Sequence, residues 1–564
     1  MTPKSNIKIE NFIKIYEKSF IENWDLPALT DYPTKKTMTY GDLATTIAMI
    51  HLFYESIGLK KGAKVAICGK DSCEWVFIYM ATITYGAVIV PILSEFNPLD
   101  ITHIVNHSEA EMLFISEQVW EHIEPEKLLK VKGVLSLEGW TLKYERQGEE
   151  LSRNLRLLRR RFRRHYPGGY RSHDVRYADR DNSEVAEINY TSGTTGFSKG
   201  VMLTGENLAG NVCFGMDTVL HFRSSRALAF LPLAHAYGCA FDMLTPLAVG
   251  SHVTLLCKTP SPRILLKALA EVRPNLVICV PLILEKIYKN QILPMISKGT
   301  MRWTLAVPLL DSFIYSKIRK KLVDAFGGEF EEVIVGGAPL NHEVEDFLHK
   351  IKFPFTVGYG MTECGPLISY TPWREFIPGS SGRTLPTMET KILSEEPERV
   401  PGEICVRGVN VMKGYYKNEK DTEKVLEPDG WLHTGDMATM DPDGTLYIRG
   451  RSKTMILSGN GQNIYPEEIE DKLNNMYLVL ESLVLDAGNG KIKALVVPDY
   501  EQAEAEGVDK ADLPQIMQNN LQELNAQLAA YERVTDITLY PTEFEKTPKR
   551  SIKRYLYEPS LLNK

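Results

Sequence analysis

The chain has 564 residues, of which 44% are hydrophobic and 24% are charged, and its formal net charge at pH 7 is −7. This length exceeds what one hydrophobic core can organise, so we expect at least two domains, and the acidic excess argues against a nucleic-acid partner. The eight cysteines form no C-x-x-C pair, so the metal-ligand spacing of paired cysteines is absent, and we predict free thiols in a reducing cytoplasm.

The first hundred or so residues contain no predicted secretory signal or membrane span. Residues 1–20 place Ile and Phe at near-helical spacing among Lys and Glu, and they lack the uninterrupted apolar run of a signal peptide. Residues 75–93, WVFIYMATITYGAVIVPIL, carry no charge, but Gly86 and Pro91 interrupt them. A bilayer requires about 20 apolar residues in one helix, so we predict a buried helix followed by a core strand at 87–91.

Short apolar runs alternate with amphipathic stretches through most of the chain. These runs are KVAIC (64–68), AVIVPI (87–92), HVTLLC (252–257), NLVICVP (275–281) and EEVIVGG (331–337). Continuous apolar runs of this length are typical of strands buried on both faces, which occur in parallel sheets with helical crossovers. The pattern therefore predicts an α/β fold.

An arginine-rich segment at 152–166, SRNLRLLRRRFRRHY, interrupts this alternation with seven arginines. Leu155, Leu158 and Phe162 lie on one face of a predicted helix, as they would in a helix that rests on a membrane surface. The alternative is a solvated insert whose charge the neighbouring acidic residues neutralise. We favour the solvated insert, and peripheral membrane contact stays as the second hypothesis.

The segment 190–201, YTSGTTGFSKGV, concentrates Ser and Thr hydroxyls and three glycines around Lys199. Hydroxyls, accessible backbone N–H groups and one cation together suit a phosphate. The segment is not the signature of P-loop nucleotide triphosphatases, because Lys199 follows Ser198 and precedes Gly200. Taken alone, it indicates a phosphate-binding loop of another family, with an ordinary surface turn as the alternative.

The sequence changes character after about residue 385. Short strands separated by Gly, Pro and Asp turns at 385–450 predict a small antiparallel or barrel-like unit. A mixture of helices and strands follows and ends in a lysine-rich tail. We therefore expect a large domain over 1–451, with the barrel-like subdomain inside it, and a small α+β domain over 452–564.

Five further motifs follow the loop at 190–201 in a fixed order. They are LPLAHAYG (231–238), VGGAPL (335–340), VGYGMTECGP (357–366), GWLHTGDMATMDPDG (430–444) and IRGRSKTMILSGNGQNIYPEEIE (448–470). In this order the set resembles the adenylate-forming superfamily, which comprises acyl-CoA synthetases, luciferase-type enzymes and peptide-synthetase adenylation domains. The resemblance covers nearly the whole chain after about residue 40, and it implies ATP, Mg²⁺ and CoA as ligands.

The resemblance assigns the loop to the β- and γ-phosphates of ATP. The loop residues that it implies are Thr191, Ser192, Gly193, Thr194, Thr195, Gly196 and Lys199. The residues that it places around adenine are Gly337, Ala338, Tyr359, Gly360 and Met361. Tyr359 offers a flat face to the base, and Gly360 allows close approach of the backbone.

Other matched positions concern the ribose, the reacting groups and the metal. Asp436 in TGD matches a carboxylate that accepts both ribose hydroxyls, and Arg451 matches a ribose-contacting arginine at the domain junction. Thr362 is expected to bond the α-phosphate, and Glu363 is expected to hold Mg²⁺ with the Thr191 hydroxyl. His235 matches a position at the mouth of the acyl pocket, although a satisfied structural histidine is an equal alternative.

Two motifs point to the substrate class. VPLILEKIYKN (280–290) resembles a stretch of long-chain acyl-CoA synthetases, with Leu282 in place of an arginine, and SGNGQNIYPEEIE (458–470) resembles bacterial long-chain ligases. The implied reaction joins a fatty carboxylate to AMP with release of pyrophosphate, and CoA then displaces AMP. Two alternatives stay open, namely acyl transfer to a carrier protein and a non-catalytic acyl or nucleotide binder. Oligomeric state is undetermined.

The resemblance also assigns roles in the C-terminal part. Lys453 matches a hinge about which the small domain rotates between the two half-reactions, and Gly459 matches the tunnel for the CoA thiol. In KTPKRSIKRYLY (546–557), Ser551 stands where the family carries a lysine that bonds the reacting oxygens. Because Pro548 favours an extended loop, we predict that Lys549 takes this role, with Lys553 as the second candidate.

Overall fold

An eight-stranded sheet with helices on it forms the N-terminal part of the computed structural model, which describes residues 7–191, 198–258, 260–296, 310–458, 462–488, 491–547 and 552–557. Its order is β20-β9-β8-β4-β3-β5-β6-β7, and its centre, from β8 to β6, is parallel. The bounds are β3 Lys64–Cys68, β4 Val88–Ile92, β5 Met112–Ile115, β6 Gly133–Ser136, β7 Leu142–Glu145, β8 Val185–Thr191, β9 Lys199–Thr204 and β20 Gly414–Tyr415.

The helices between the central strands begin and end where the sequence supplies caps. Thr39 forms a capping box with Asp42 at the start of α2 (Tyr40–Ser56), and Ser72 caps α3 (Cys73–Tyr85). Gly86 ends α3 in the left-handed conformation, with φ +86°, and β4 follows directly. The prediction of a buried helix and a core strand at 75–93 is confirmed. Helix α4 (Pro98–His107) connects β4 to β5.

A second group of strands continues the parallel pattern. One sheet has the order β10-β11-β1-β2, and another has the order β12-β13-β14. The apolar runs expected to be strands form β11 (His252–Leu255), β12 (Leu276–Cys279) and β13 (Glu332–Val335), and the latter two pair in parallel. The remaining strands are β1 Pro27–Asp31, β2 Thr37–Thr39, β10 Arg226–Ala229 and β14 Phe355–Val357.

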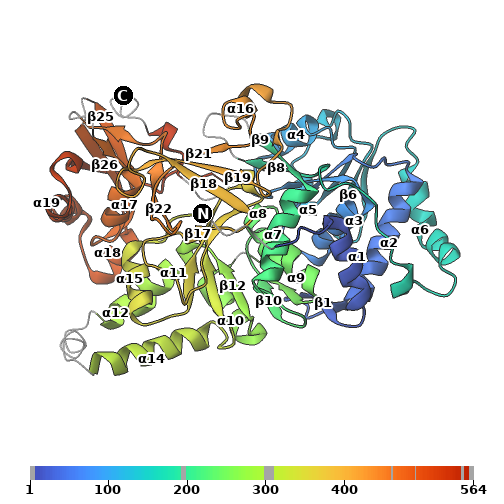
Figure 1. Ribbon diagram of the computed structural model, residues 1–564, viewed down its shortest axis with the longest axis horizontal. Helices are drawn as coiled ribbons and strands as arrows, with labels where there is room; N and C mark the ends of the chain where they lie inside the picture. Colours follow the sequence, from blue (N-terminus) through green and yellow to red (C-terminus); the bar gives the residue numbers. More distant parts are fainter. Residues whose placement is uncertain are drawn as a thin grey trace.

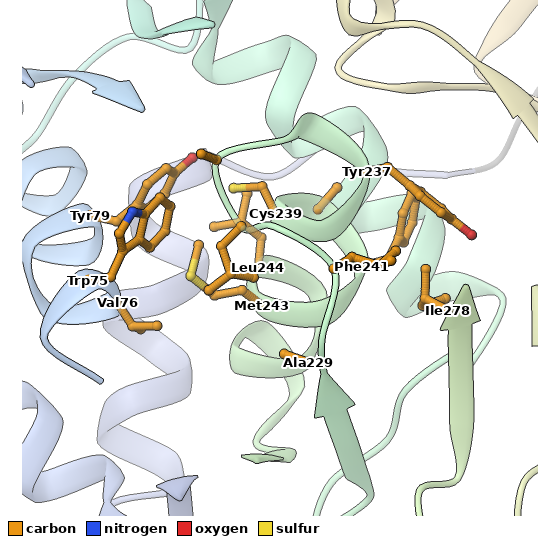
Figure 2. Close-up of a cluster of buried hydrophobic side chains, with 14 of the residues drawn as sticks. Trp75, Val76, Tyr79, Ala229, Tyr237, Cys239, Phe241, Met243, Leu244 and Ile278 are labelled. Atoms are coloured by element: carbon orange, nitrogen blue, oxygen red, sulfur yellow. The ribbon is translucent and has the colours of Figure 1, made fainter. Parts of the chain in front are cut away.

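Helices pack around these sheets. They are α1 Phe12–Glu22, α5 Glu117–Trp120, α7 Gly205–Asp217, α8 Ala236–Gly238, the π-helix η3 Cys239–Leu244, α9 Thr245–Val249, α10 Pro262–Val272, α11 Pro281–Ile287, α12 Leu293–Ile296, α14 Leu310–Ala325 and α15 His342–Lys350. Figure 2 shows Trp75, Val76 and Tyr79 of α3 facing Cys239, Met243 and Leu244 of η3 across a buried apolar cluster. This contact joins the two groups of strands through one core.

Antiparallel strands follow, as the turn-rich sequence after residue 385 predicts. Strands β15 (Tyr359–Gly360), β16 (Leu367–Tyr370) and β17 (Arg383–Thr384) form one sheet. Strands β18 (Met388–Leu393), β19 (Gly402–Gly408), β21 (Leu432–Met440) and β22 (Leu446–Arg451) form another, and α16 (Glu419–Glu423) precedes β21. An isolated bridge between Arg383 and Thr445 connects the two sheets.

The elements after β22 have hydrophobic cores of their own and gather at one end of the molecule, orange to red in Figure 1. They are β23 Ile456–Leu457, β24 Asn463–Ile464, α17 Pro466–Asn474, β25 Val479–Gly488, β26 Lys491–Pro498, α18 Tyr500–Glu506, α19 Leu513–Gln527 and β27 Val534–Leu539. This is the α+β composition expected of a small C-terminal domain. Polar contacts tie it to the rest, since Asn341 Nδ2 lies 2.9 Å from Asp471 Oδ1 and Lys289 Nζ lies 2.7 Å from the Asn474 carbonyl oxygen. The 451/452 boundary itself stays a prediction.

The arginine-rich segment is a helix, α6 (Leu151–His165), that packs against α2. Leu158 is buried in the main core, Leu155 packs against it, and the Phe162 ring lies 5.1 Å from the Tyr166 ring. The apolar face that a membrane-surface helix would need is therefore occupied by protein contacts. Among the described helices, none is long and apolar enough to cross a membrane. Peripheral membrane contact stays a hypothesis.

Candidate functional site

The two strands that flank the phosphate loop form an antiparallel pair. Thr191 at the end of β8 stands opposite Lys199 at the start of β9. The predicted residues Ser192, Gly193, Thr194, Thr195 and Gly196 connect them and lie outside the described residues. Strands β8 and β9 nevertheless lie side by side towards one edge of the large sheet. The buried residues 187–190 of β8 hold this pair of strands in place. Thr191 and Lys199 are thus brought to the same place, as expected.

Lys199 has partners that the sequence analysis missed. Its Nζ lies 2.9 Å from Asp421 Oδ2 and 4.8 Å from the centroid of the Tyr415 ring. Strand β20 delivers this ring, because Tyr415 pairs with Val201 of β9. Lys424 lies 2.7 Å from the other oxygen of Asp421, and hydrogen bonds from Lys424 and then Lys199 hold the pKa of Asp421 well below its usual range. The loop lysine is therefore paired with a carboxylate.

Tyr415 also contacts the predicted metal ligand. Its hydroxyl donates to Glu363 Oε1 at 2.9 Å. Burial, and then the charge of Glu363, raise the pKa of Tyr415 above its ordinary value, so the hydroxyl keeps its proton and acts as a donor. One aromatic side chain thus lies between Lys199 and Glu363. Carboxylate and hydroxyl oxygens are the donors that Mg²⁺ prefers, so Glu363 and Thr191 have the chemistry to hold it, and their role as its ligands stays a prediction.

The turn before Glu363 is closely packed. A Cβ at Gly360 would lie 2.2 Å from the Pro366 carbonyl oxygen, so only glycine fits there. Thr362 is buried at the start of the 3₁₀-helix Thr362–Cys364, whereas Met361 and Glu363 are half-buried. This packing fixes the backbone from Tyr359 to Glu363 against the strand that follows.

Asp436 is the centre of the predicted ribose site. It is a buried residue of β21 whose strand partner is Arg451 at the end of β22. Its Oδ2 accepts the Tyr359 hydroxyl at 2.6 Å, and its Oδ1 lies 2.9 Å from Arg451 Nε. Burial raises the pKa of Asp436 and the arginine opposes this shift, while Asp436 raises the pKa of Arg451.

The structure therefore brings Tyr359, Asp436 and Arg451 together, as the sequence analysis expected of a nucleotide site. Both oxygens of the carboxylate already contact protein groups. Because a carboxylate has about four lone pairs, the two remaining pairs can still accept the hydroxyls of a diol. Tyr359 is oriented through its hydroxyl, which leaves the ring as the contact surface.

The predicted adenine residues Gly337 and Ala338 are exposed in the loop after β13. Gly337 has a φ of +87°, a left-handed conformation that favours glycine. The loop leaves the carboxyl end of a parallel strand, which is where ligands bind in open α/β sheets. Tyr237 supports this edge, because its hydroxyl donates to the Ile334 carbonyl oxygen at 3.1 Å.

His235 lies at the start of α8, where it is half-buried. The Tyr237 N–H group donates to its Nδ1 at 3.3 Å, so the side chain has a structural role as a helix cap. Nearby, the Leu233 N–H group donates to Asp71 Oδ1 at 2.9 Å. Contact between His235 and an acyl substrate stays a prediction.

The predicted hinge lies in an exposed turn. Lys453 is exposed between Arg451 and Thr454, and Thr454 Oγ1 donates to Glu467 of α17 at 2.7 Å. Gly459, Lys549 and Ser551 lie outside the described residues. The second candidate for the tail role, Lys553, lies 3.3 Å from Glu545. The roles given to Lys453, Gly459 and Lys549 stay predictions.

Comparisons with known proteins found a matching family, similar sequences and similar structures. The family described as AMP-binding enzyme matches residues 17–416, and the C-terminal domain of AMP-binding enzymes matches residues 453–559. The peroxisomal long chain acyl-CoA synthetase 6 of Arabidopsis thaliana is 30% identical over 86% of this chain and 72% of its own length. The long-chain-fatty-acid–CoA ligase FadD15 of Mycobacterium bovis is 27% identical over 92% of this chain and 90% of its own length.

Solved structures share the fold. The crystal structure of ATP-bound MatB from Rhodopseudomonas palustris has a TM-score of 0.74 and 22% identity, and the match covers 97% of this chain and 98% of that one. The anthranilate CoA ligase AuaEII in complex with anthranoyl-AMP has a TM-score of 0.75 and 20% identity, with 98% of each chain covered. At these identities the similarity concerns the arrangement of elements, which extends over both parts of the chain.

Proposed function

Because the chain belongs to the AMP-binding enzyme family and is an adenylate-forming acyl-CoA ligase, we propose that its acyl substrate is a long-chain fatty acid. The group formed by Tyr359, Asp436 and Arg451, together with Lys199, Tyr415 and Glu363, is the observation that carries the adenylate-forming part of this function. The first set suits a ribose and its base, and the second suits a triphosphate with Mg²⁺. The names of the relatives, long-chain acyl-CoA synthetases and ligases, support the substrate class.

The proposed reaction has two steps. In the first, a carboxylate oxygen of the fatty acid attacks the α-phosphorus of ATP, the bond to the bridging oxygen breaks, and pyrophosphate leaves. In the second, the thiol sulfur of CoA attacks the acyl carbon, the thiol proton goes to solvent, and AMP leaves. Negative charge increases on the phosphate oxygens during the first step, and Lys199 is the described residue that can offset it. Mg²⁺ neutralises phosphate charge when it is bound with ATP.

Two further roles belong to this proposal. Residues 452–564 form a domain that turns about Lys453 between the two steps, and Lys549 contacts the reacting oxygens from the tail. Lys546, three residues earlier, lies 2.7 Å from Glu481, which anchors the preceding backbone to β25. Ser551 stands where the family carries a lysine, and this difference supports the alternative of a non-catalytic binder. An acyl carrier protein is the alternative to CoA as the acceptor of the acyl group.

Pyrophosphate release with a series of carboxylates from acetate to oleate tests the proposal. We expect release with the long chains and weak release with acetate or benzoate, and we expect CoA to convert the bound product to a thioester. A preference for short or aromatic acids would contradict the substrate class while leaving the ligase chemistry intact. Adenylate formation without a CoA thioester would favour a carrier protein, and no pyrophosphate release with any acid would favour the non-catalytic binder.

A further inference from the structure

Three side chains with metal-binding atoms meet on the antiparallel sheet beside Asp436. Glu403 and Cys405 project from the same face of β19, two residues apart, and His433 stands opposite Cys405 on β21. One ligand atom from each residue lies within 4.8 Å of the other two, and no other such group of three occurs within the described ranges. Cys405 is buried, whereas about a quarter of the side chains of Glu403 and His433 (27% each) is exposed to solvent.

The distances in this cluster fit one tetrahedral ion. Cys405 Sγ lies 3.5 Å from His433 Nδ1, and Glu403 Oε2 lies 3.0 Å from the same nitrogen. With Zn–S bonds of about 2.3 Å and Zn–N or Zn–O bonds of about 2.0 Å, tetrahedral geometry separates S from N by about 3.6 Å and N from O by about 3.3 Å. The two pairs that include His433 Nδ1 are therefore within a few tenths of an ångström of this geometry, and the third pair, Cys405 Sγ and the Glu403 oxygen, lies within 4.8 Å.

The surroundings orient two of these ligand atoms. His433 Nε2 lies 2.7 Å from Glu427 Oε1, so the ring can donate its Nε2 proton there while Nδ1 faces Cys405 and Glu403. Metal-binding histidines usually donate their second nitrogen to a carboxylate in this way. Glu403 Oε1 accepts the Gly435 N–H group at 3.0 Å, and this bond directs Oε2 towards the cluster.

We propose that Glu403, Cys405 and His433 bind one zinc ion that links β19 to β21. Thiolate, imidazole and carboxylate form a ligand set that zinc favours, whereas Mg²⁺ does not take thiolate. The Cys405 thiol proton goes to solvent on binding, and the thiolate and the carboxylate then balance the two charges of the ion. Solvent fills the fourth position on the exposed side of the sheet.

The site ties two strands together at a functionally important point. The register of β19 and β21 shifts between Glu403 and Cys405, so the ladder is irregular there. His433 is followed by Thr434, Gly435 and Asp436, and Gly435 is already held by Glu403. An ion across the two strands would stiffen the segment that carries the ribose-binding carboxylate. The inference concerns metal binding and does not depend on the acyl substrate.

Cobalt(II) is the probe, added to the reduced, chelator-treated full chain without ATP and with excess Mg²⁺ to occupy oxygen-only sites. We expect about one Co²⁺ per chain with the strong visible bands of a tetrahedral site and a thiolate-to-cobalt charge-transfer band, and we expect Zn²⁺ to displace it. Weak octahedral spectra without a charge-transfer band would overturn the proposal. So would failure of the unmodified chain to bind either ion.

Variants locate the ion. Cys405→Ser and His433→Gln should each lower the affinity for Co²⁺ by about tenfold to a hundredfold or more, and Glu427→Gln should have a smaller effect. Cys257→Ser is the matched control, because Cys257 is half-exposed and outside the cluster. Equal binding in Cys405→Ser and the unmodified chain would assign the ion elsewhere.

A measurement on the unmodified chain avoids the folding of variants. Zn²⁺ should protect Cys405 from a thiol-alkylating reagent, as read by peptide mass mapping after brief partial unfolding in urea, and should leave Cys257 equally labelled with and without the ion. A simple ion pair of His433 with its two glutamates predicts no protection of Cys405, which would reject the metal site.

Discussion

At the scale of single residues, the pairing of Lys199 with Asp421 is a contact that the triphosphate has to compete with. The ammonium lies 2.9 Å from the carboxylate, and both side chains are partly exposed. Partly exposed ion pairs contribute little to stability, so a multiply charged ligand can displace Asp421 at small cost. The contact orients Lys199 before the ligand arrives.

We predict that Lys199→Ala lowers kcat/KM for ATP by about a hundredfold or more, because it removes a positioned cation from the reacting phosphates. Asp421→Asn should lower KM for ATP, since it frees Lys199 from its partner. Initial rates of pyrophosphate release against ATP concentration measure both. Lys424→Ala is the control, because Lys424 binds the other oxygen of the same carboxylate at 2.7 Å. Unchanged kinetics in Lys199→Ala would make the loop an ordinary turn.

Tyr415 is a positioning residue for the predicted metal ligand. Tyr415→Phe keeps the ring beside Lys199 and removes the hydroxyl that donates to Glu363. We expect the Mg²⁺ concentration for half-maximal activity to rise about tenfold or more, since one neutral-to-charged hydrogen bond is worth about 1.5 kcal/mol or more, while KM for the acid stays unchanged.

The neighbouring tyrosine supplies the control for that variant. The Tyr416 hydroxyl donates to Glu109 at 3.0 Å, away from Glu363, so Tyr416→Phe should leave the Mg²⁺ dependence as it is. If Tyr415→Phe and Tyr416→Phe shift the Mg²⁺ dependence equally, the Tyr415 hydroxyl has no specific role at Glu363.

At the residue level, the sequence indicated positions that belong to family motifs, and it did not indicate contacts outside those motifs. Tyr359, Asp436 and Arg451 were expected at one site and do meet there. Tyr415 and Asp421 were missed, because only the pairing of β20 with β9 brings them to Lys199 from more than 200 positions away. The cluster of Glu403, Cys405 and His433 was not predicted for the same reason. Its cysteine and histidine come from two strands, and they have no sequence spacing typical of zinc sites.

At the scale of elements, apolar runs predicted where strands lie, but an apolar pattern does not show which surface or partner covers it. The five runs named in the sequence analysis coincide with β3, β4, β11, β12 and β13. The arginine-rich helix shows the limit, because the amphipathic pattern of α6 is the same whether its apolar face meets a membrane or α2. Only tertiary structure decides between these two partners.

The turn after β22 carries the prediction about domain movement. The N–H groups of Thr454 and Met455 donate to the Arg451 carbonyl oxygen within this turn, the Ser452 N–H group donates to Gly435 of β21, and Lys453 is exposed. Lys453→Pro restricts φ to about −65°, so it should block a large rotation at this residue without removing these bonds. We expect adenylation to keep at least about half its rate and thioester formation to fall about tenfold or more.

Separate assays of pyrophosphate release and of thioester formation from supplied acyl-adenylate measure the two steps. Lys453→Ala serves as the control, because it removes the charge and leaves φ free. Parallel loss of both steps in Lys453→Pro would point to misfolding, and loss of neither would remove the hinge from this residue.

At the scale of the whole molecule, several buried ionisable groups make stability depend on pH in opposite directions. Burial lowers the pKa of His51 and of His221 to about 4. Burial also raises the pKa of Asp71, Glu345 and Glu470 to about 7. Between pH 4 and 7 the histidines make the free energy of unfolding increase as pH rises, whereas the carboxyls make it increase as pH falls. The free energy of unfolding of the unmodified chain, measured against pH, therefore does not separate the two sets of groups.

A difference between two proteins isolates His51. Its Nε2 lies 3.0 Å from the Ala81 carbonyl oxygen and 3.1 Å from Thr84 Oγ1, and its ring packs against Tyr85 and Tyr177. Nε2 must carry a proton to donate to a carbonyl, which fixes the tautomer of the neutral ring. A second proton would place a charge in this buried, aromatic site.

We therefore predict that His51→Gln changes the pH dependence of stability in one direction. The folded pKa lies below the unfolded value of about 6.5, so the unfolded chain binds the extra proton first, and His51 loses stabilising effect as pH falls from about 6.5 to about 4. The free energy of unfolding of the unmodified chain, minus that of His51→Gln, should fall by about 3 kcal/mol between pH 7 and pH 4.

Urea unfolding at each pH measures this difference, and the carboxyls cancel because both proteins contain them. His122→Gln, at an exposed position, is the control for the effect of replacing a histidine by glutamine on the measured free energies. A flat difference for His51→Gln would mean that His51 gains its second proton at the same pH in the folded and the unfolded chain, and that the contact between α2 and α3 accommodates the charge below that pH.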